Sequence, residues 1–335
     1  MIRAVEVKDK KFCAALCFME NNCFSYNTKT RSINGKLKCE LNNATHEEHE
    51  NDLLDNPDYV YRAAENACAS NPCSNKATCQ TGFTNFGYRC LCPRGFTGQT
   101  CENAISSCKE IHDSNRFIEN KAYFLKVGNQ SILAYCVLNE TSLGPCGGGG
   151  WTLVMKINGA QQTFQYDSPL WSDKTAFNIV GGETGFDEQE TKLPTYWETP
   201  FSKICLGMKI PGEQTVHFIA VNQSADSLYS SIADQQFRST SLGAAKWKSL
   251  LGSQGSLQLG CRKEGFNVIC NSQSHAKARI GIVGNNEADC GTCDSRIGFG
   301  TTGNHDSSNT CGNEAVIAPD NGDKHIKAMG YIFIQ

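Results

Sequence analysis

The sequence predicts a multidomain, disulfide-rich α+β protein, and two observations carry that prediction. Nineteen of its 335 residues are cysteine, a usage typical of chains that fold in an oxidising compartment. Six of these cysteines lie between Cys68 and Cys101, in a segment too short to bury a stabilising core of its own. We therefore expect covalent cross-links to hold this segment together, and we expect the protein to fold outside the cytosol.

Charge, hydropathy and motifs argue against several classes of protein. The chain has 31 basic and 34 acidic residues, which gives a formal net charge of −3, and its lysines and arginines are scattered, so neither a nucleic-acid partner nor electrostatic membrane docking is expected. No apolar run approaches the roughly 18 residues that span a bilayer. Gly-x-Ser-x-Gly and His-Glu-x-x-His motifs are missing from the sequence, and the seven histidines are dispersed. The sequence thus predicts no catalytic residues and no enzyme.

Residues 1–64 form the first predicted domain. Asp9 can cap a helix whose apolar residues Phe12, Leu16 and Met19 recur at i, i+4 and i+7. Four residues separate Cys13 from Cys17, so both thiols should face one side of that helix. Short strand-like pieces follow at 23–26, 39–41 and 59–61.

This order resembles the PAN or apple family, in which a helix is stapled to a curved sheet. The resemblance implies the disulfides Cys13–Cys39 and Cys17–Cys23. Family members often carry a strand before the helix, and we expect too little chain before Cys13 for it. The charged start also lacks a signal-peptide core, which favours an N-terminally truncated chain over one whose signal was removed. We expect the acidic run 46–50 to be a solvated loop rather than a metal site.

Residues 65–103 form the second predicted domain, with cysteines spaced C-x4-C-x5-C-x10-C-x-C-x8-C. Spacing alone leaves about 15 pairings open, and a zinc site is disfavoured because it needs four ligands in paired spacings. The segment is identified as a member of the EGF-like family. That resemblance implies Cys68–Cys79, Cys73–Cys90 and Cys92–Cys101. It also implies no calcium in this domain, because 64–67 carries no acidic cluster and Phe83 stands where calcium-binding members have Asp or Asn.

Several short motifs predict a secreted glycoprotein. The family's O-glucosylation and O-fucosylation patterns match at Ser70 and Thr78 respectively. Unmodified loop residues are the alternative at both positions, since the motifs are short. Four sequons mark asparagines for N-glycosylation, namely Asn43, Asn129, Asn139 and Asn222.

Residues 104–335 form the third predicted domain, which begins with Cys108, Cys136 and four glycines before Trp151. This start resembles the fibrinogen C-terminal domain. The run of four glycines followed by Trp151 resembles the intelectins, which are lectin relatives of that domain. The resemblance implies a mixed α+β domain with long irregular loops and a Cys108–Cys136 disulfide. A local hairpin would suit Cys261–Cys270. Five cysteines stay unassigned: Cys146, Cys205, Cys290, Cys293 and Cys311.

An odd number of unassigned cysteines leaves one thiol free or bridged to another chain, which is compatible with a covalent oligomer. The pair Cys290 and Cys293 lies in a Gly/Asn-rich loop without the strand-to-helix setting of a redox motif. We expect structural disulfides there, with a zinc site that includes His305 and Cys311 as the alternative.

The binding site is expected in the irregular stretch 284–327, between β-rich runs at 278–283 and 331–335 that suit central strands. In fibrinogen-like domains this region binds calcium and then a ligand. The resemblance implies calcium as a cofactor, and hydrogen-bonded Asx turns are the alternative. The implied calcium ligands are Asn285, Asn286, Glu287, Asp306 and Asn309.

Taken together, the domains predict a secreted, non-catalytic adhesion protein of an extracellular matrix. The full chain resembles skeletal organic matrix proteins of stony corals, which implies a role in biomineralization. The near balance of acidic and basic residues favours protein and glycan contacts over a charged mineral template. The alternative function is a calcium-dependent carbohydrate-binding lectin in recognition or defence.

Overall fold

Two compact units make up the chain in the computed structural model, residues 1–104 (unit 1) and 105–335 (unit 2). The structure describes residues 1–20, 22–46, 54–63, 67–68, 70–81, 86–114, 119–271 and 274–335. In these ranges no helix has the length and apolar character needed to cross a membrane.

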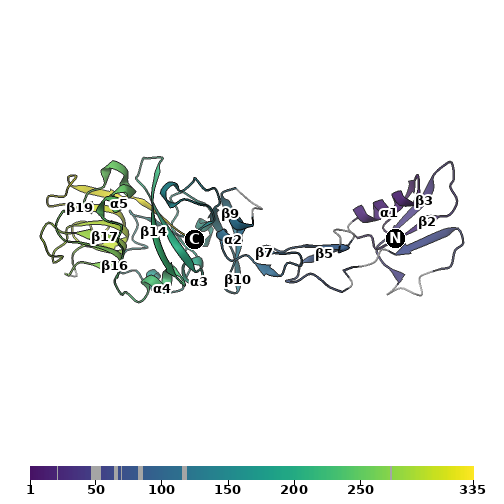
Figure 1. Ribbon diagram of the computed structural model, residues 1–335, viewed down its shortest axis with the longest axis horizontal. Helices are drawn as coiled ribbons and strands as arrows, with labels where there is room; N and C mark the ends of the chain where they lie inside the picture. The colour runs from purple at the N-terminus through teal and green to yellow at the C-terminus, as the bar shows by residue number, and fades with distance from the viewer. Residues whose placement is uncertain are drawn as a thin grey trace. The chain divides into compact units, whose positions relative to one another are not determined.

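The first part of unit 1 is one helix and a four-stranded antiparallel sheet in the order β1-β3-β2-β4 (Figure 1). As predicted, Asp9 caps the helix, and its side chain accepts a hydrogen bond from the Phe12 amide at 2.9 Å. The expectation that no strand fits before the helix is wrong, because five residues suffice for β1, which pairs with β3. The elements are β1 (Arg3–Val7), α1 (Lys10–Met19), β2 (Ser25–Lys29), β3 (Leu37–Asn42) and β4 (Tyr59–Ala63).

Cystines form most of the small core of this sheet. The disulfides Cys13–Cys39 and Cys17–Cys23 are both present, and the four cysteines are buried together with Val7 and Leu41. The cysteine face of α1 therefore packs on the sheet. Phe12 and Met19 of the predicted apolar stripe are instead 54% and 69% exposed.

The rest of unit 1 consists of two short hairpins. They are formed by β5 (Thr78–Thr81) with β6 (Tyr88–Leu91) and by β7 (Phe96–Thr97) with β8 (Asn103–Ala104). All three disulfides implied for this segment are confirmed: Cys68–Cys79, Cys73–Cys90 and Cys92–Cys101. Residues 64–66 and Phe83, which led us to expect no calcium here, lie outside the described residues, as do residues 47–50 of the acidic run.

Unit 2 is built on two antiparallel sheets. The seven-stranded sheet has the order β14-β13-β21-β11-β10-β9, with β12 beside β11, and the six-stranded sheet runs from β15 to β20 in sequence order. The first sheet contains β9 (Lys121–Val127), β10 (Gln130–Val137), β11 (Trp151–Asn158), β12 (Thr191–Lys192), β13 (Phe201–Lys209), β14 (Val216–Ala225) and β21 (Met329–Ile334). The second contains β15 (Arg238–Ser239), β16 (Arg262–Ile269), β17 (Lys277–Gly284), β18 (Ser295–Thr302), β19 (Cys311–Ala315) and β20 (Lys324–Lys327).

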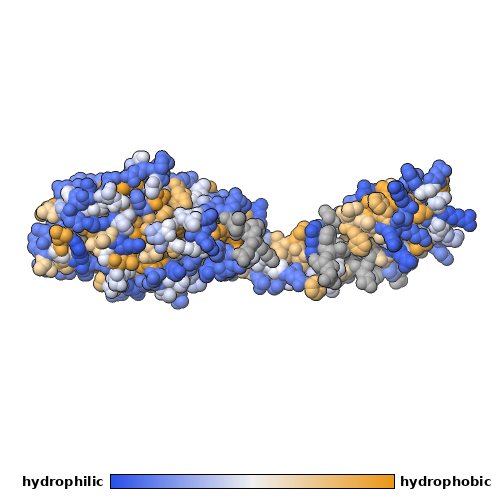
Figure 2. All heavy atoms as spheres, turned by 45° about the horizontal axis from the view of Figure 1, so that its top comes forward, coloured by the Kyte–Doolittle hydropathy of each residue, from blue (hydrophilic) through white to orange (hydrophobic). Residues whose placement is uncertain are grey.

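Short helices complete unit 2, and none of those described exceeds six residues. The α-helices are α2 (Cys108–Asp113), α3 (Thr195–Glu198), α4 (Leu228–Ile232) and α5 (Ala244–Lys248). The 3-10 helices are η3 (Gly144–Cys146), η4 (Pro169–Trp171), η5 (Ile179–Glu183) and η6 (Ser249–Gln254). Figure 2 shows that the visible surface of this unit is mostly hydrophilic.

Apolar side chains cover both faces of the seven-stranded sheet, which accounts for the almost continuous burial of β11 and β21. One cluster joins it to the six-stranded sheet and includes Ile332, Ile280 and Phe299. As expected, β17 and β21 are interior strands. The stretch 284–327 is more regular than expected, because β18, β19 and β20 lie within it.

The disulfides of unit 2 correct one prediction. Cys108–Cys136 is present and Cys146 pairs with Cys205, but Cys261 pairs with Cys290 and Cys270 with Cys293. The expected Cys261–Cys270 bridge is wrong because these residues flank the two ends of β16. Eight extended residues separate such ends by roughly 26 Å, whereas bridged Cα atoms lie within about 7 Å.

The remaining cysteine, Cys311, is free and fully buried. Burial raises the pKa of its thiol well above the usual value. A covalent oligomer through this cysteine is therefore contradicted. The zinc alternative is also excluded, because Cys290 and Cys293 are both oxidised.

We predict that the native protein shows no thiol reactive toward a maleimide and that one thiol per chain appears in concentrated guanidinium chloride. Peptide mapping without reduction should then recover Cys261 linked to Cys290. A labelled native Cys311, or a peptide that joins Cys261 to Cys270, would contradict the fold.

Candidate functional site

The candidate site is a polar depression of about 440 Å³ in unit 2, where β17 begins and β18 ends. Lys277 and Thr302 are opposed across these strands, so the sheet register fixes their spacing. Hydroxyl, amide, imidazole and charged groups make up most of the lining, which consists of Asp167, Ser274, Lys277, Thr302, Gly303, Asn304, His305 and Ser307.

A buried guanidinium holds the loop that forms one side of the depression. Arg296 of β18 is 1% exposed and donates to the carbonyl oxygens of Gly303, Asn304 and Asp306, at 2.6 Å for Asn304. Burial lowers the pKa of Arg296 to about 10, while the nearby carboxylates of Glu314 and Asp306 act in the opposite direction. The side chain thus stays cationic at neutral pH and fixes the path of the loop.

Asp306 fixes the far end of the same loop. One carboxylate oxygen accepts hydrogen bonds from the amide and hydroxyl of Ser308, and the other lies 3.0 Å from the Lys327 ammonium. Burial raises the pKa of Asp306, but the Ser308 hydrogen bonds and Lys327 outweigh it and hold that pKa at about 2. In the same loop, His305 Nε2 lies 3.2 Å from a carboxylate oxygen of the buried Asp294.

Lys277 contributes the cation of the depression. Its ammonium lies 5.4 Å from the centre of the Tyr166 ring, and the Arg279 guanidinium lies 4.2 Å from the same ring. Arg279 also donates to the Tyr166 carbonyl, which orders the segment that leads to Asp167. A cation and an anion from distant parts of the chain therefore line the same depression.

Four of the five predicted calcium ligands are engaged in other contacts, Asn286 through its side-chain oxygen, which accepts from Gln258. The buried Asn285 donates to the Asp289 carbonyl and accepts from the Asn286 amide, while Asn286 and Glu287 are exposed. Buried Asn309 donates to two backbone carbonyls, and Lys327 pairs with Asp306. In the part of the chain that the structure describes, no group of three or more His, Cys, Asp and Glu could hold a metal ion. This donor set fits calcium poorly.

Local turns account for much of the same region. The Asp289 carboxylate accepts from the Gly291 amide at 2.7 Å, as the Asp306 carboxylate does from the Ser308 amide at 2.9 Å. Both are contacts from residue i to i+2, the pattern of Asx turns. These are the turns that the sequence offered as the alternative to calcium.

The predicted sugar-attachment residues lie at the surface. All four sequon asparagines are exposed, as are Ser70 and Thr78. At Asn139 the side-chain oxygen accepts from both the amide and the hydroxyl of Thr141, so the sequon is held in a compact turn. Asn222 lies on β14, an edge strand, and Asn129 lies in the turn between β9 and β10. Each of these sites is exposed and therefore has room for a bulky sugar.

Sequence reasoning missed most of the depression. It singled out His305, but not Arg296, Lys277 or Asp167. Arg296 did give a signal, because an arginine inside an otherwise apolar and glycine-rich run, 295–300, must find polar partners once the strand is buried. No sequence pattern pointed to Asp167, because only the tertiary fold brings it to the site.

Comparison with known proteins identifies the middle of the chain. Residues 68–100 match the EGF-like domain model. A notch homologue 1 of Xenopus tropicalis is 43% identical over 44 residues, 13% of this chain and 2% of that protein. Human EGF-like repeat and discoidin I-like domain-containing protein 3 is 45% identical over 47 residues (12% and 10%), and Fibropellin-1 of Strongylocentrotus purpuratus is 36% identical over 72 (21% and 7%).

The chain thus spans a tenth or less of the length of these relatives.

Two solved structures are also similar, both fibrinogen-like globe domains. That of human ANGPTL2 is 12% identical, with 69% of this chain and 98% of that chain covered and a TM-score of 0.28. The globe domain of human ANGPTL6 is 17% identical, with 36% of this chain and 49% of that chain covered and a TM-score of 0.25. The fibrinogen-like and PAN/apple resemblances remain predictions, while residues 68–100 are an EGF-like domain in a disulfide-bonded extracellular protein.

We predict that Asp306→Asn lowers the free energy of unfolding at pH 7 by about 1–2 kcal/mol. This is less than the pKa shift alone would give, because solvent screens the partly exposed carboxylate. The folded-state pKa of about 2 lies below the ordinary aspartate value, so this stabilisation is present above about pH 4 and is lost as the pH falls toward 2. Denaturant titrations at several pH values measure it. The exposed Asp226→Asn is the control. A difference from wild type that stays constant down to the acid limit would refute the assignment.

Proposed function

We propose that the protein is a non-catalytic, secreted adhesion protein of an extracellular matrix that contacts glycans through the polar depression of unit 2. One observation carries this proposal, namely that Lys277, Asp167, Asn304 and hydroxyl side chains line one cavity. Sugar hydroxyls donate and accept hydrogen bonds at once, so a ligand of this class is complementary to such mixed groups.

Preorganisation supports the same proposal. Arg296 holds the loop 303–307 through its backbone carbonyls, and the Asp306 carboxylate holds it through the Ser308 amide. The polar groups on the loop therefore need little ordering when a ligand binds. The Tyr166 ring restrains the Lys277 side chain in the same way.

The surroundings of the site also suit an extracellular matrix. The EGF-like domain and nine disulfides belong to an oxidising, extracellular setting, and the exposed sequons suit a glycoprotein. The resemblance to coral skeletal matrix proteins makes a biomineral skeleton the proposed matrix. With 34 acidic against 31 basic residues, the protein would act there through protein and glycan contacts.

A calcium-dependent lectin is the second candidate. The exposed residues Asn286, Glu287 and Asp289 favour it, because they carry amide and carboxylate oxygens in one surface turn, where Asn286 Oδ1 also accepts from Gln258 Nε2 at 3.4 Å. That turn is separate from the lining of the depression, so the two candidates place the ligand on different residues.

A glycan array probed with the full chain, with and without a chelator, tests the proposal. We expect binding that persists in chelator, falls at least tenfold in both Lys277→Ala and Asp167→Asn, and is unchanged in the control Lys203→Ala, an exposed lysine of β13. Two variants are used because either alone could disturb folding.

The other outcomes decide between the candidates. Binding that disappears in chelator, and in Glu287→Gln but not in Lys277→Ala, would support the lectin and refute the depression. Failure to bind any glycan, or binding that survives both variants, would refute the proposed function.

A further inference from the structure

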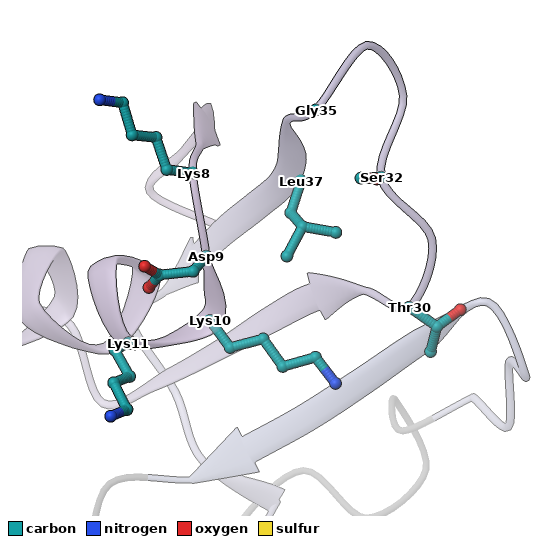
Figure 3. A pocket seen from close by; sticks show the side chains of 8 residues that line it. All are labelled: Lys8, Asp9, Lys10, Lys11, Thr30, Ser32, Gly35 and Leu37. Carbon is teal, nitrogen blue, oxygen red and sulfur yellow. The ribbon is translucent and has the colours of Figure 1, made fainter.

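A second candidate surface lies on unit 1, between the start of α1 and the turn that joins β2 to β3. The cavity there is about 610 Å³. Figure 3 shows its side chains, which come from two segments of the chain. We name it the lysine groove, lined by Lys8, Asp9, Lys10, Lys11, Thr30, Ser32, Gly35 and Leu37.

The groove has an excess of positive charge. Three of its lining residues are exposed lysines, and none of them forms an ion pair with any residue that the structure describes. Its one carboxylate, Asp9, already accepts the Phe12 amide as the helix cap. Next to the groove, Glu6 pairs with Lys36, so that acidic residue does not offset the lysines. Lys29 and Arg31 add further positive charge on the adjoining hairpin.

The directions of the lysine side chains indicate the shape of the ligand. In Figure 3 the ammonium groups of Lys8, Lys10 and Lys11 point away from one another instead of converging. Three separated charges cannot surround one small anion, but they can each meet a charge on an extended polyanion. At the hairpin, Gly35 has a φ of +74° with open space around the position of a Cβ, so the turn leaves the groove accessible.

We propose that the lysine groove binds a sulfated polysaccharide. Such a chain carries repeated negative charge along an extended, hydroxyl-rich backbone, which matches separated ammonium groups beside Thr30 and Ser32. The extracellular setting favours this partner over nucleic acid, and over the anionic lipid that is characteristic of the cytoplasmic leaflet. The proposal goes beyond the proposed function, because it concerns a different unit and different residues.

Binding of the full chain to immobilised heparin and chondroitin sulfate tests the proposal. The variant with Lys8→Gln, Lys10→Gln and Lys11→Gln should bind at least tenfold more weakly, and binding by the wild type should weaken steeply as salt is added. A variant with arginine at the same three positions keeps the charge and should bind within about threefold of wild type.

Matched controls separate a site from general attraction. Glutamine at the exposed lysines Lys76, Lys174 and Lys203 makes the same change in net charge and should leave binding unaltered. Equal losses in both glutamine variants, or no loss in the groove variant, would overturn the proposal. So would tighter binding to vesicles of anionic lipid than to either polysaccharide.

Discussion

The candidate site depends on where the buried guanidinium of Arg296 can find partners. A cation removed from water must be compensated, and three loop carbonyls with the nearby Glu314 carboxylate do so here. The compensation is incomplete among the described residues, because Arg296 Nε and Glu314 Oε2 are buried without a hydrogen-bond partner. Because the buried Arg296 needs these carbonyl partners, it fixes the path of residues 303–306 and with it the shape of the depression.

Disulfides impose the second constraint, and they act differently in the two units. In unit 1 the cystines are most of the buried core of the first sheet, so the fold needs them as packing as well as cross-links. In unit 2 a large apolar core joins two sheets, and the bridges Cys261–Cys290 and Cys270–Cys293 tie the loop between β17 and β18 to both ends of β16. There the covalent bonds position a loop beside a large apolar core.

Local signals predicted the local structure well. The Asp9 cap, the strands β17 and β21 and the pairing of the EGF-like cysteines all follow from short-range patterns or from a family with fixed spacing. Predictions failed where distant segments meet. The predicted Cys261–Cys270 bridge did not allow for the strand between the two cysteines, and of the two sides of α1 it is the cysteine side that is buried, while Phe12 and Met19 of the apolar stripe are exposed. The depression draws on separate segments, so no spacing pattern could reveal it.

If the Arg296 guanidinium holds the loop in place, replacing it should loosen residues 303–309, and amide hydrogen exchange of Arg296→Lys measures that change. Lysine keeps the positive charge but cannot donate to three carbonyls in a fixed fork. We expect the amides of residues 303–309 to exchange at least tenfold faster than in wild type, while those of β11 and β21 keep their protection. Unchanged exchange in the loop, with the core equally protected, would contradict it.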